Sequence, residues 1–498
     1  MKKTLFILFL IACNQVLAQT FNYRYDIQDD QVGDAATNIE TTSDGYIVFR
    51  QGKFPTFPYK ERIGFFGIDE SGNQIFDKVY GADSIFNWTG WSNNGSPTMD
   101  GNYVICGWAQ FDTIYNPYII KYTEMGDTLW RYNYYSNYEY RGFSGCQASD
   151  GGYVVVGLTD EPENPNDPPY LGYILKTDSE GEFLWLHKYW SLTYSIYILS
   201  VAPLEDGFIA SGVAIIDGFN SDLIVIRTDS MGNEIWRKLY GSNSHDGDCK
   251  VNICGDGNFI IAGYWDDTTN DAPFVAFPFV AKIDSSDGDV IWERKFYPGS
   301  YSPDLLKILE LNDGSIVTAG WKWSSATVNG EELWSYKGVI AKLSSEGDSL
   351  WMRTYAFEDG YESTFRDVIA SNDGGFIAVG QATPSPDYIS SDAWVVKTDE
   401  FGCVVPGCQV SILEEEQTMN FLIYPNPTND VLNIYLETIG SSDGIFIFTD
   451  LSGREIKSFK ASGNLTTYGC DLSFLSAGTY ILSYTGSIGT LSKVILKR

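Results

Sequence analysis

The residues with the clearest chemical potential are acids and tryptophans gathered in a few long, variable segments. Asp266, Asp267 and Asp271 share one segment, and clustered carboxylates can hold calcium or act as an acid–base pair. Exposed indole rings can stack on sugar rings. The tryptophans in or beside these segments are Trp108, Trp265, Trp321, Trp323 and Trp334. We take the three acids as candidate calcium ligands and the five tryptophans as candidate ligand-binding residues.

Other chemistries have less support in the sequence. A second acidic segment carries Asp160, Glu161, Glu163 and Asp167, but no segment shows the D-x-D-x-D-G spacing of a calcium loop. With His187 and His245 as the only histidines, a zinc site or a serine triad has few bases to draw on. The alternative is that the loop acids are simply solvated and that the tryptophans cap the surface of the fold. We assign no catalytic residue and no resident cofactor other than calcium.

Two repeated signatures define the elements that must position these segments. The spacing of the first, an Asp-Gly turn that opens an apolar run, is between 50 and 60 residues, which is typical of propellers and solenoids. The turns begin at Asp44, Asp100, Asp150, Asp206, Asp256, Asp313 and Asp373. The second signature is [Trp/Phe]-x-x-x-[Tyr/Phe], at Phe21/Tyr25, Phe76/Tyr80, Trp130/Tyr134, Trp185/Tyr189, Trp236/Tyr240, Trp292/Phe296 and Trp351/Tyr355.

Each repeat contains four short runs of β-branched and aromatic residues separated by turn residues, which predicts four antiparallel strands. Such a sheet is stable only when it packs against neighbours around an axis, so we expect an all-β fold, a seven-bladed β-propeller. Structural wedges between blades are expected at Trp130, Trp185, Trp236, Trp292 and Trp351. A cross-strand charge ladder is expected at Lys121, Lys176, Arg227, Lys282, Lys342 and Lys397.

The two signatures are out of phase by one element. The last repeat, which begins at Asp373, has no Trp-x-x-x-Tyr of its own, and Phe21–Tyr25 has no repeat of its own. We therefore predict that this first strand closes the ring by pairing beside Trp394–Asp399.

The connections fall into two classes, which predicts one working face. Turns between strands one and two and between strands three and four are short and uniform. The other connections vary, and binding residues are usually displayed on variable loops held by a rigid scaffold. The long segments are Gln51–Arg62, Leu158–Leu171, Tyr264–Pro278 and Trp321–Lys337.

One repeat resembles a known family. Asp284-Ser-Ser-Asp-Gly288-Asp-Val-Ile-Trp292 is similar to the tryptophan-docking repeat of quinoprotein-type propellers. Enzymes of that family use a vicinal cysteine pair and a calcium-bound quinone cofactor, and this chain has no adjacent cysteines. The resemblance therefore implies the fold but not the cofactor.

The amino end and the composition indicate an exported protein. Met1-Lys2-Lys3, the apolar run that follows and Val16-Leu17-Ala18 form a signal peptide over residues 1–18; the rival is a lipoprotein signal that cleaves before Cys13. A formal net charge of −32 disfavours nucleic acid and anionic membranes as partners. Cys403 and Cys408 flank a Pro-Gly turn and are the disulfide candidate, while Cys249 and Cys254 on one predicted strand are too far apart to bridge.

The last ninety residues form a module of different composition. After the propeller at 19–408 and a linker at 409–417, residues 418–498 show short alternating strands, which suggests a small Ig-like sandwich. The ordered elements Tyr424-Pro425-Asn426-Pro427, Asp-x-x-Gly453-Arg, Ser-x-Gly478-x-Tyr480 and a terminal strand with Lys497 resemble the type A C-terminal sorting domain of the type IX secretion system of Bacteroidetes.

That resemblance implies passage through the periplasm and the outer membrane, with the secretion machinery and its sortase as partners. It also implies removal of the domain near residues 409–420 and attachment of the cargo to the cell surface or its release. We expect a monomeric propeller that binds a glycan or a surface protein without catalysis. A polysaccharide-active hydrolase or lyase that uses loop acids and tyrosines is the enzymatic alternative, and a structural surface-layer component is the third.

Overall fold

The computed structural model describes residues 19–498 except 26–32, 54–60, 81–85, 91–93, 165–166, 218–219, 243, 267–275, 297–303, 329–330, 358–361, 384–390, 406–407, 409–419, 425–427, 429–430, 438–443, 451–453, 462–466 and 487–488. The chain divides into two compact units, Met1–Gln409 and Val410–Arg498. The predicted signal peptide and linker lie outside the described residues. No helix among the described residues has the length and apolarity of a membrane span.

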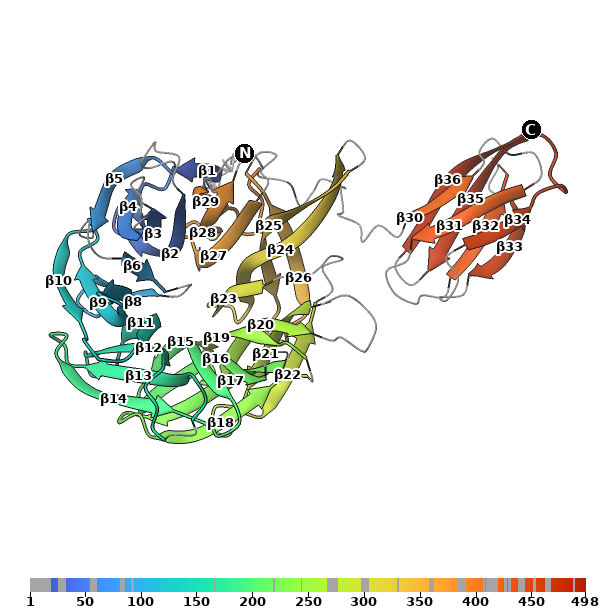
Figure 1. Ribbon diagram of the computed structural model, residues 1–498. Helices are drawn as coiled ribbons and strands as arrows, with labels where there is room; N and C mark the ends of the chain where they lie inside the picture. Colours follow the sequence, from blue (N-terminus) through green and yellow to red (C-terminus); the bar gives the residue numbers. More distant parts are fainter. Residues whose placement is uncertain are drawn as a thin grey trace, which may run out of the picture. The chain divides into compact units, whose positions relative to one another are not determined.

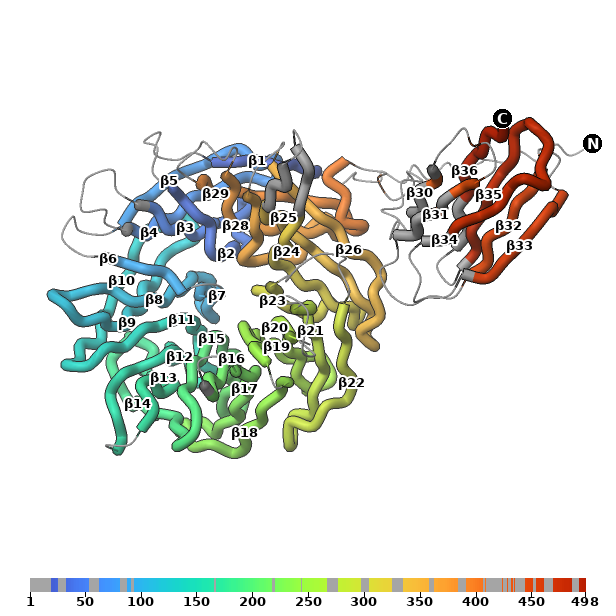
Figure 2. The backbone as a smooth tube through the Cα atoms, turned by 45° about the vertical axis from the view of Figure 1, so that its right-hand side comes forward, coloured from blue at the N-terminus to red at the C-terminus, as the bar shows by residue number. Residues whose placement is uncertain are grey.

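Unit 1 is built mainly of four-stranded antiparallel groups of strands that follow one another in chain order around a ring (Figure 1). The first strand of each sheet lies toward the centre and the fourth lies at the periphery. Figure 2 shows the same succession from another side. The described strands thus have the propeller-like arrangement that the repeats predict.

The strands of the first four sheets are β2 (Asp34–Thr42), β3 (Gly45–Lys53), β4 (Glu61–Ile68) and β5 (Gln74–Tyr80); β6 (Phe86–Thr89), β7 (Gly95–Pro97), β8 (Tyr103–Phe111), β9 (Ile114–Tyr122) and β10 (Thr128–Asn133); β11 (Tyr140–Gln147), β12 (Tyr153–Thr159), β13 (Leu171–Thr177) and β14 (Phe183–Tyr189); β15 (Ser195–Leu204), β16 (Gly207–Asp217), β17 (Asn220–Asp229) and β18 (Glu234–Tyr240). In the second of these sheets, β6 and β7 both pair with β8 and together take the place of one inner strand.

The remaining strands of unit 1 are β19 (Gly247–Ile253), β20 (Phe259–Asp266), β21 (Ala276–Ile283) and β22 (Val290–Lys295); β23 (Asp304–Glu310), β24 (Ile316–Val328), β25 (Glu331–Leu343) and β26 (Ser349–Tyr355); β27 (Glu362–Ala370), β28 (Phe376–Thr383) and β29 (Asp392–Thr398), with β1 (Phe21–Tyr25). A single parallel pair, Tyr336 with Glu362, joins the last two sheets.

The first strand closes the ring, as predicted. β1 pairs antiparallel with β29, from Phe21 opposite Lys397 to Tyr25 opposite Ala393. The buried Trp394 donates its indole N–H to Asn22 Oδ1 at 2.6 Å. The amino-terminal strand is therefore the fourth strand of the last sheet.

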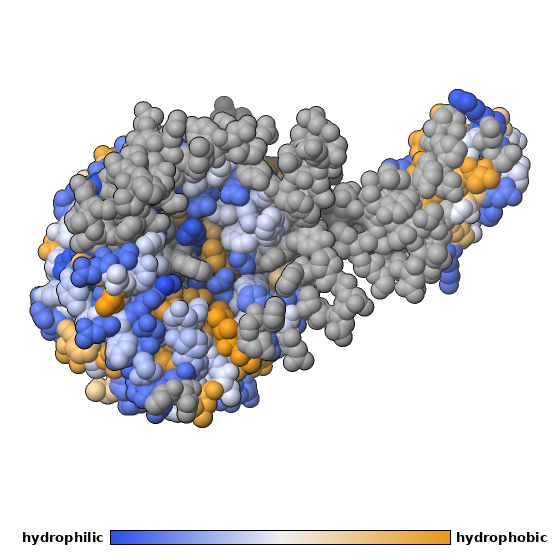
Figure 3. All heavy atoms as spheres, viewed as in Figure 1, coloured by the Kyte–Doolittle hydropathy of each residue, from blue (hydrophilic) through white to orange (hydrophobic). Residues whose placement is uncertain are grey.

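The burial of each strand follows from its place in the sheet. The third strand β13 is buried along its whole length, because sheets pack on both of its faces. The fourth strand β14 begins with the exposed Phe183 and Leu184 and ends with the buried Tyr189. Other outer strands also expose aliphatic side chains, and Figure 3 shows hydrophobic residues scattered among hydrophilic ones on the face that it views.

The Trp-x-x-x-Tyr signature docks each sheet onto the next one. Tyr240 at the end of β18 donates its hydroxyl to the carbonyl of Gly288 at 2.6 Å, in the turn before the fourth strand of the next sheet. Trp236 lies against the same glycine, which has a φ of 77°. A side chain at that glycine would meet the indole and would be strained in the left-handed region. The contact recurs between Tyr25 and Gly72, Tyr134 and Gly181, Tyr189 and Gly232, and Tyr355 and Gly402.

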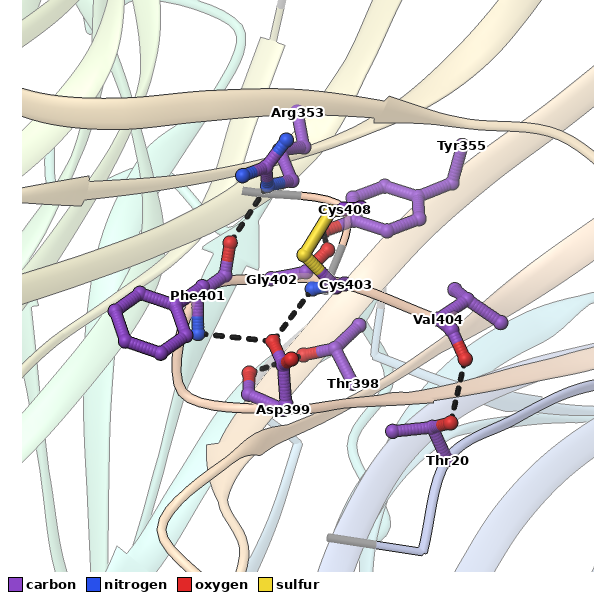
Figure 4. The surroundings of a disulfide bond; sticks show 10 residues. All are labelled: Thr20, Arg353, Tyr355, Thr398, Asp399, Phe401, Gly402, Cys403, Val404 and Cys408. Atoms are coloured by element: carbon purple, nitrogen blue, oxygen red, sulfur yellow. Dashed lines mark hydrogen bonds between the residues drawn. A yellow bond between two sulfur atoms is a disulfide. The ribbon is translucent and has the colours of Figure 1, made fainter. Parts of the chain in front are cut away.

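Figure 4 shows this docking at the last sheet. Tyr355 donates to the carbonyl of Gly402 at 2.7 Å, and Arg353 Nε donates to the carbonyl of Phe401 at 2.6 Å. Next to this turn, Cys403 and Cys408 form a disulfide with a Cα–Cα distance of 5.6 Å. The other described cysteines are buried as free thiols, among them Cys249 and Cys254.

The predicted charge ladder is a set of ion pairs within each sheet. Each basic residue of the third strand reaches the aspartate of the Asp-Gly turn of its own sheet. The pairs are Lys121–Asp100, Lys176–Asp150, Arg227–Asp206, Lys282–Asp256, Lys342–Asp313 and Lys397–Asp373, at 2.6 to 3.9 Å. The repeated basic residue is thus paired with the aspartate of the adjacent turn in its own sheet.

Unit 2 consists of two antiparallel sheets that share one core. Buried Leu432, Phe446 and Leu482 belong to this core and come from both sheets. The strands are β30 (Asn420–Tyr424), β31 (Val431–Glu437), β32 (Gly444–Thr449), β33 (Glu455–Ala461), β34 (Thr467–Asp471), β35 (Gly478–Gly486) and β36 (Gly489–Lys497).

The residues predicted to carry the sorting signal lie at the ends of these strands. Gly478 pairs with Lys497, and Tyr480 donates its hydroxyl to the carbonyl of Ser476 at 2.9 Å. Tyr424 ends β30. Pro425, Asn426, Pro427 and Gly453 lie outside the described residues. Thr428, which follows Pro427 in the sequence, exchanges backbone hydrogen bonds with Leu496 and Arg498 and so contacts the end of β36.

Candidate functional site

A polar position recurs on the innermost strands of unit 1. It lies six residues before the aspartate of each Asp-Gly turn, next to a β-bulge in most sheets. A bulge re-aims a side chain relative to a regular strand. The residues are Asn38, Asn94, Ser144, Ser200, Lys250, Lys307 and Asp367, and all except Lys307 are buried. We call them the inner polar ring.

Part of the inner polar ring is hydrogen-bonded from sheet to sheet. Lys307 forms an ion pair with Asp367 at 3.2 Å, and Asp367 Oδ2 accepts the Asn38 side-chain amide at 2.6 Å. Asn38 Oδ1 in turn accepts the backbone N–H of Gly95 at 2.7 Å. These contacts link β23, β27, β2 and β7, and they satisfy polar groups that burial would otherwise penalise.

Glu40 lies beside this network, two residues after Asn38 on β2. Burial raises the pKa of its carboxyl to about 8, the charge of Asp367 adds to the rise, and the charge of Lys307 opposes it. Glu40 therefore holds a proton at neutral pH in the folded state.

The inner polar ring has different contacts at Lys250, where four titratable side chains lie on neighbouring inner strands. We call Asp248, Lys250, Tyr264 and Asp304 the acid–lysine cluster. Asp248 and Lys250 belong to β19. Tyr264 lies on β20, where it pairs with Gly247 of β19, and Asp304 begins β23. Lys250 is only 3% exposed, while the two aspartates are half-buried and so reach the surface. Among the described residues, none gives these four side chains a hydrogen bond or an ion pair.

The electrostatics of the acid–lysine cluster follow from burial and proximity. Burial and the charge of Asp248 raise the pKa of Asp304 well above its usual range, and Lys250 opposes this rise. Burial lowers the pKa of the Lys250 amine, against the charges of Asp248 and Asp304. Burial and then the nearby aspartates raise the pKa of Tyr264. The cluster thus combines a carboxyl whose pKa is raised with a second, half-buried carboxyl.

An aromatic group extends from the acid–lysine cluster along the β24–β25 hairpin. Trp321 pairs with Asp304 in the β23–β24 ladder, so the two residues are neighbours. The Trp321 and Trp323 rings both contact the Tyr336 ring, with centroid distances of 4.8 and 4.3 Å. All three are half-buried. We call these three residues the aromatic platform.

The hairpin itself differs from the prediction. The segment Trp321–Lys337 is not a loop, because the β24–β25 ladder continues to Val328 opposite Glu331. Asn329-Gly330 between them is the strongest two-residue hairpin signal in a sequence, and it explains the extended strands. Trp334 pairs with Ser325 in this ladder; its side chain lies outside the described residues.

The other two candidate tryptophans lie within strands, where Trp108 is buried and Trp265 is half-buried. Trp108 in β8 is 6% exposed, stacks on Trp88 at 5.9 Å and meets Phe143 of the next sheet edge-on at 5.4 Å. Trp265 in β20 packs on Phe279, and the Lys295 ammonium lies 3.8 Å from the centre of its ring. Their faces therefore contact protein side chains.

The candidate metal ligands are only partly described. Asp266 is buried and accepts a hydrogen bond from Ser244 Oγ at 2.7 Å. Asp267 and Asp271 lie outside the described residues. Within the described ranges, no three His, Cys, Asp or Glu side chains gather closely enough to hold a metal ion. In the other acidic segment, Glu161 and Glu163 pair with Lys188, at 3.3 and 2.8 Å.

Sequence reasoning missed the inner polar ring and with it the acid–lysine cluster. The signal was present, since the residue six places before each Asp-Gly aspartate is polar in every repeat. Those residues change from amide to hydroxyl, amine and carboxyl, so a search for one repeated residue type overlooks them.

Comparison with known proteins identifies unit 2. Residues 422–498 match the family described as the secretion system C-terminal sorting domain. This domain of the type IX secretion system indicates export to the cell surface or the extracellular space, and it implies interaction with the type IX secretion machinery. No curated protein matches the chain.

Several solved structures are similar to the chain in fold. The α-L-arabinofuranosidase of Fusarium graminearum in complex with arabinobiose is 11% identical, with a TM-score of 0.43, over 76% of this chain and 98% of that one. Sqt1 from Chaetomium thermophilum is 11% identical, with a TM-score of 0.41, over 74% and 97%. The α-L-arabinanase of Penicillium chrysogenum is 9% identical, with a TM-score of 0.40, over 76% and 98%.

Proposed function

We propose that this exported protein is a seven-bladed β-propeller that binds a glycan along the aromatic platform of the β24–β25 hairpin. The observation that carries the proposal is the grouping of Trp321, Trp323 and Tyr336 on a hairpin longer than its counterparts in the other sheets. Half-buried aromatic rings held by a regular ladder are rigid, which lowers the entropic cost of stacking on a sugar.

The architecture in this proposal rests on the repeats. Seven Asp-Gly turns and seven aromatic signatures support seven blades, and the β1–β29 pairing supports a closed ring. For unit 2, two sheets around one core support an Ig-like sandwich.

Export proceeds, in this proposal, through a cleaved signal peptide and later removal of the sorting domain near residues 409–420 by the sortase of the system. We expect deletion of 418–498 to leave the propeller in the periplasm. Fractionation of the cells and blotting of each fraction measures this. Normal secretion of the truncated protein would contradict it.

Glycan binding is tested by affinity electrophoresis of the full chain in gels that contain arabinan, xylan, laminarin or alginate. We expect retardation by at least one polysaccharide, and loss of that retardation in Trp321→Ala with Trp323→Ala. The matched control is Trp190→Ala, which removes an exposed indole from another sheet connection. Retardation by none of the glycans, or equal retardation of both variants, counts against the proposal.

A polysaccharide-active hydrolase or lyase is the second candidate function. It is favoured by the position of Asp304, whose pKa is raised and whose backbone pairs with that of Trp321 in the platform. New sugar ends released from a bound glycan would distinguish this function from binding alone.

A further inference from the structure

We propose that Asp304 and Asp248, with Lys250 beneath them, form an acid–base centre that hydrolyses a glycosidic bond of the glycan bound on the aromatic platform. The inference rests on the proposed function, because it takes its substrate from that binding site. It adds an activity, a reaction class and named roles for residues on the inner strands.

The position of the two carboxyls is the first argument. Asp304 and Asp248 lie on neighbouring innermost strands and both reach the surface, and Asp304 pairs with Trp321 of the platform. A sugar chain that stacks on the platform therefore continues toward the carboxyls. Glycoside hydrolysis generally uses a pair of carboxyl groups that flank the bond to be broken.

Lys250 provides a second and independent observation. Its side chain is 3% exposed and carries no hydrogen bond or ion pair from the described part of the chain. Yet it interacts electrostatically with both Asp248 and Asp304. Buried polar groups in native proteins are almost always hydrogen-bonded, so a lysine with this burial, close enough to interact electrostatically with two carboxyls, indicates a place for polar ligand atoms.

The backbone of Asp248 is the third observation. It has a φ of 56°, in the left-handed region that non-glycine residues rarely adopt, at the bulge between Gly247 and Lys250. This conformation is strained for a residue that has a side chain. Such strain clusters at functional sites, where the surrounding structure fixes a side chain in a demanding position.

The environments of the two carboxyls give them different roles. The raised pKa of Asp304 favours its protonated form, and this form suits it to the role of proton donor. Asp248 supplies the carboxylate. Lys250 is a positioning residue, because its amine interacts electrostatically with both carboxyls.

The reaction balances with water as the only co-reactant. Asp304 donates its proton to the glycosidic oxygen as the bond from that oxygen to the anomeric carbon breaks. The electron pair of that bond stays with the departing sugar oxygen. Asp248 takes a proton from water while the water oxygen forms the new bond to the anomeric carbon. One proton then passes from Asp248 to Asp304 through solvent, and the centre is restored.

The experiment measures binding and turnover on the same glycans. Asp304→Asn and Asp248→Asn remove the proton donor and the base with little change in shape. Asp313→Asn is the matched control, since it changes an exposed aspartate in the turn of the same sheet as Asp304. Affinity electrophoresis measures binding, and a reducing-sugar assay measures new chain ends.

We expect the wild-type protein and Asp313→Asn to release reducing ends from a glycan that they bind. Asp304→Asn and Asp248→Asn are expected to bind it equally and to lose about 100-fold or more in turnover. If the wild-type protein binds a glycan but releases no ends, or releases unsaturated sugars that reveal elimination, the inference is wrong and the binding function stands. Wild-type turnover in Asp304→Asn also overturns it. Failure of the wild-type protein to bind any glycan overturns the proposed function itself.

Discussion

The sheets of unit 1 touch one another at two radii, and the two sets of contacts differ in character. At the periphery, an aromatic pair docks on a left-handed glycine of the next sheet, as Trp236 and Tyr240 do on Gly288. On the innermost strands the equivalent positions carry amide, hydroxyl, amine or carboxyl groups. Some of these are paired across sheets, whereas Lys250 carries no such bond from the described residues.

This difference suggests that the outer contacts assemble the sheets, whereas the inner positions carry the features individual to each sheet. A contact that repeats unchanged serves a need common to all sheets, which is packing against a neighbour. A position that keeps its polarity but changes its chemistry gives each sheet an individual side chain near the centre. The residues that distinguish this protein from a generic propeller therefore lie inside the ring rather than at its edge.

The largest effect is expected at the periphery. Trp236→Ala removes the indole that lies against Gly288 and should lower the free energy of unfolding by about 3–5 kcal/mol. Ile235→Ala, the exposed neighbour, should change it by less than about 0.5 kcal/mol. Urea unfolding followed by fluorescence measures both. An unchanged midpoint for Trp236→Ala would show that the outer contact is not the main support of the ring.

A pH-dependent effect of intermediate size is expected inside the ring. The pKa of Glu40 is about 8 in the folded state, against an ordinary value of 4.5 for a glutamate carboxyl. Between these values the unfolded chain releases a proton that the folded protein holds, so stability falls as pH rises through this window. Below pH 4.5 both states hold the proton and the penalty disappears.

Glu40→Gln should therefore stabilise the protein by about 2–4 kcal/mol at pH 8 and hardly at all at pH 4. The upper figure follows from about 1.4 kcal/mol for each pKa unit, and the partial exposure of Glu40 reduces it. Urea midpoints at the two pH values measure this difference. An equal effect of the substitution at both values would mean that Glu40 titrates normally.

A smaller effect is expected for the outer hydroxyl. Tyr240→Phe removes its hydrogen bond to Gly288 and should cost about 1 kcal/mol. The fifth sheet offers the reverse change, because Phe296 occupies the tyrosine position there. Phe296→Tyr should recover a similar amount, and thermal unfolding of both variants checks the pair. Destabilisation by Phe296→Tyr would show that this docking site has a different geometry.

The smallest effect is expected for the ion pairs of the Asp-Gly turns. Asp206 is 69% exposed where it meets Arg227, so Asp206→Asn should cost less than about 0.5 kcal/mol. Asp150→Asn should cost more, since it deprives the buried Lys176 of its carboxylate. Urea unfolding of the two variants ranks them, and a larger loss for Asp206→Asn would reverse this interpretation.

The sequence was sufficient for features that repeat. The phase of the aromatic signature predicted that Phe21–Tyr25 pairs with β29, because an unmatched strand and an incomplete repeat require each other. The docking of tyrosine on glycine was not foreseen, but both residues recur at fixed spacing. Repetition alone distinguishes these positions from chance.

The candidate site was predicted less well, for physical reasons. The long β24–β25 hairpin was not predicted, although Asn329-Gly330 in the sequence is a strong hairpin signal. Trp108 was expected to bind a ligand, but it lies in a covered strand and stacks on Trp88. The sequence could not show this, because a tryptophan that stacks on a ligand and one that stacks on another side chain are the same residue type. The left-handed backbone of Asp248 depends on a bulge, and bulges arise from the fit between strands rather than from one residue type.

The pairing of β1 with β29 has a mechanical consequence. In a surface-attached form of the protein, tension on the chain that follows Cys408 would enter unit 1 at the turn after β29. There the load is shared by two antiparallel neighbours, β28 and β1, and by the link between Cys403 and Cys408. A pulling force would thus act in shear on the three paired strands β28, β29 and β1. Several backbone hydrogen bonds would have to break at once before the ring could open.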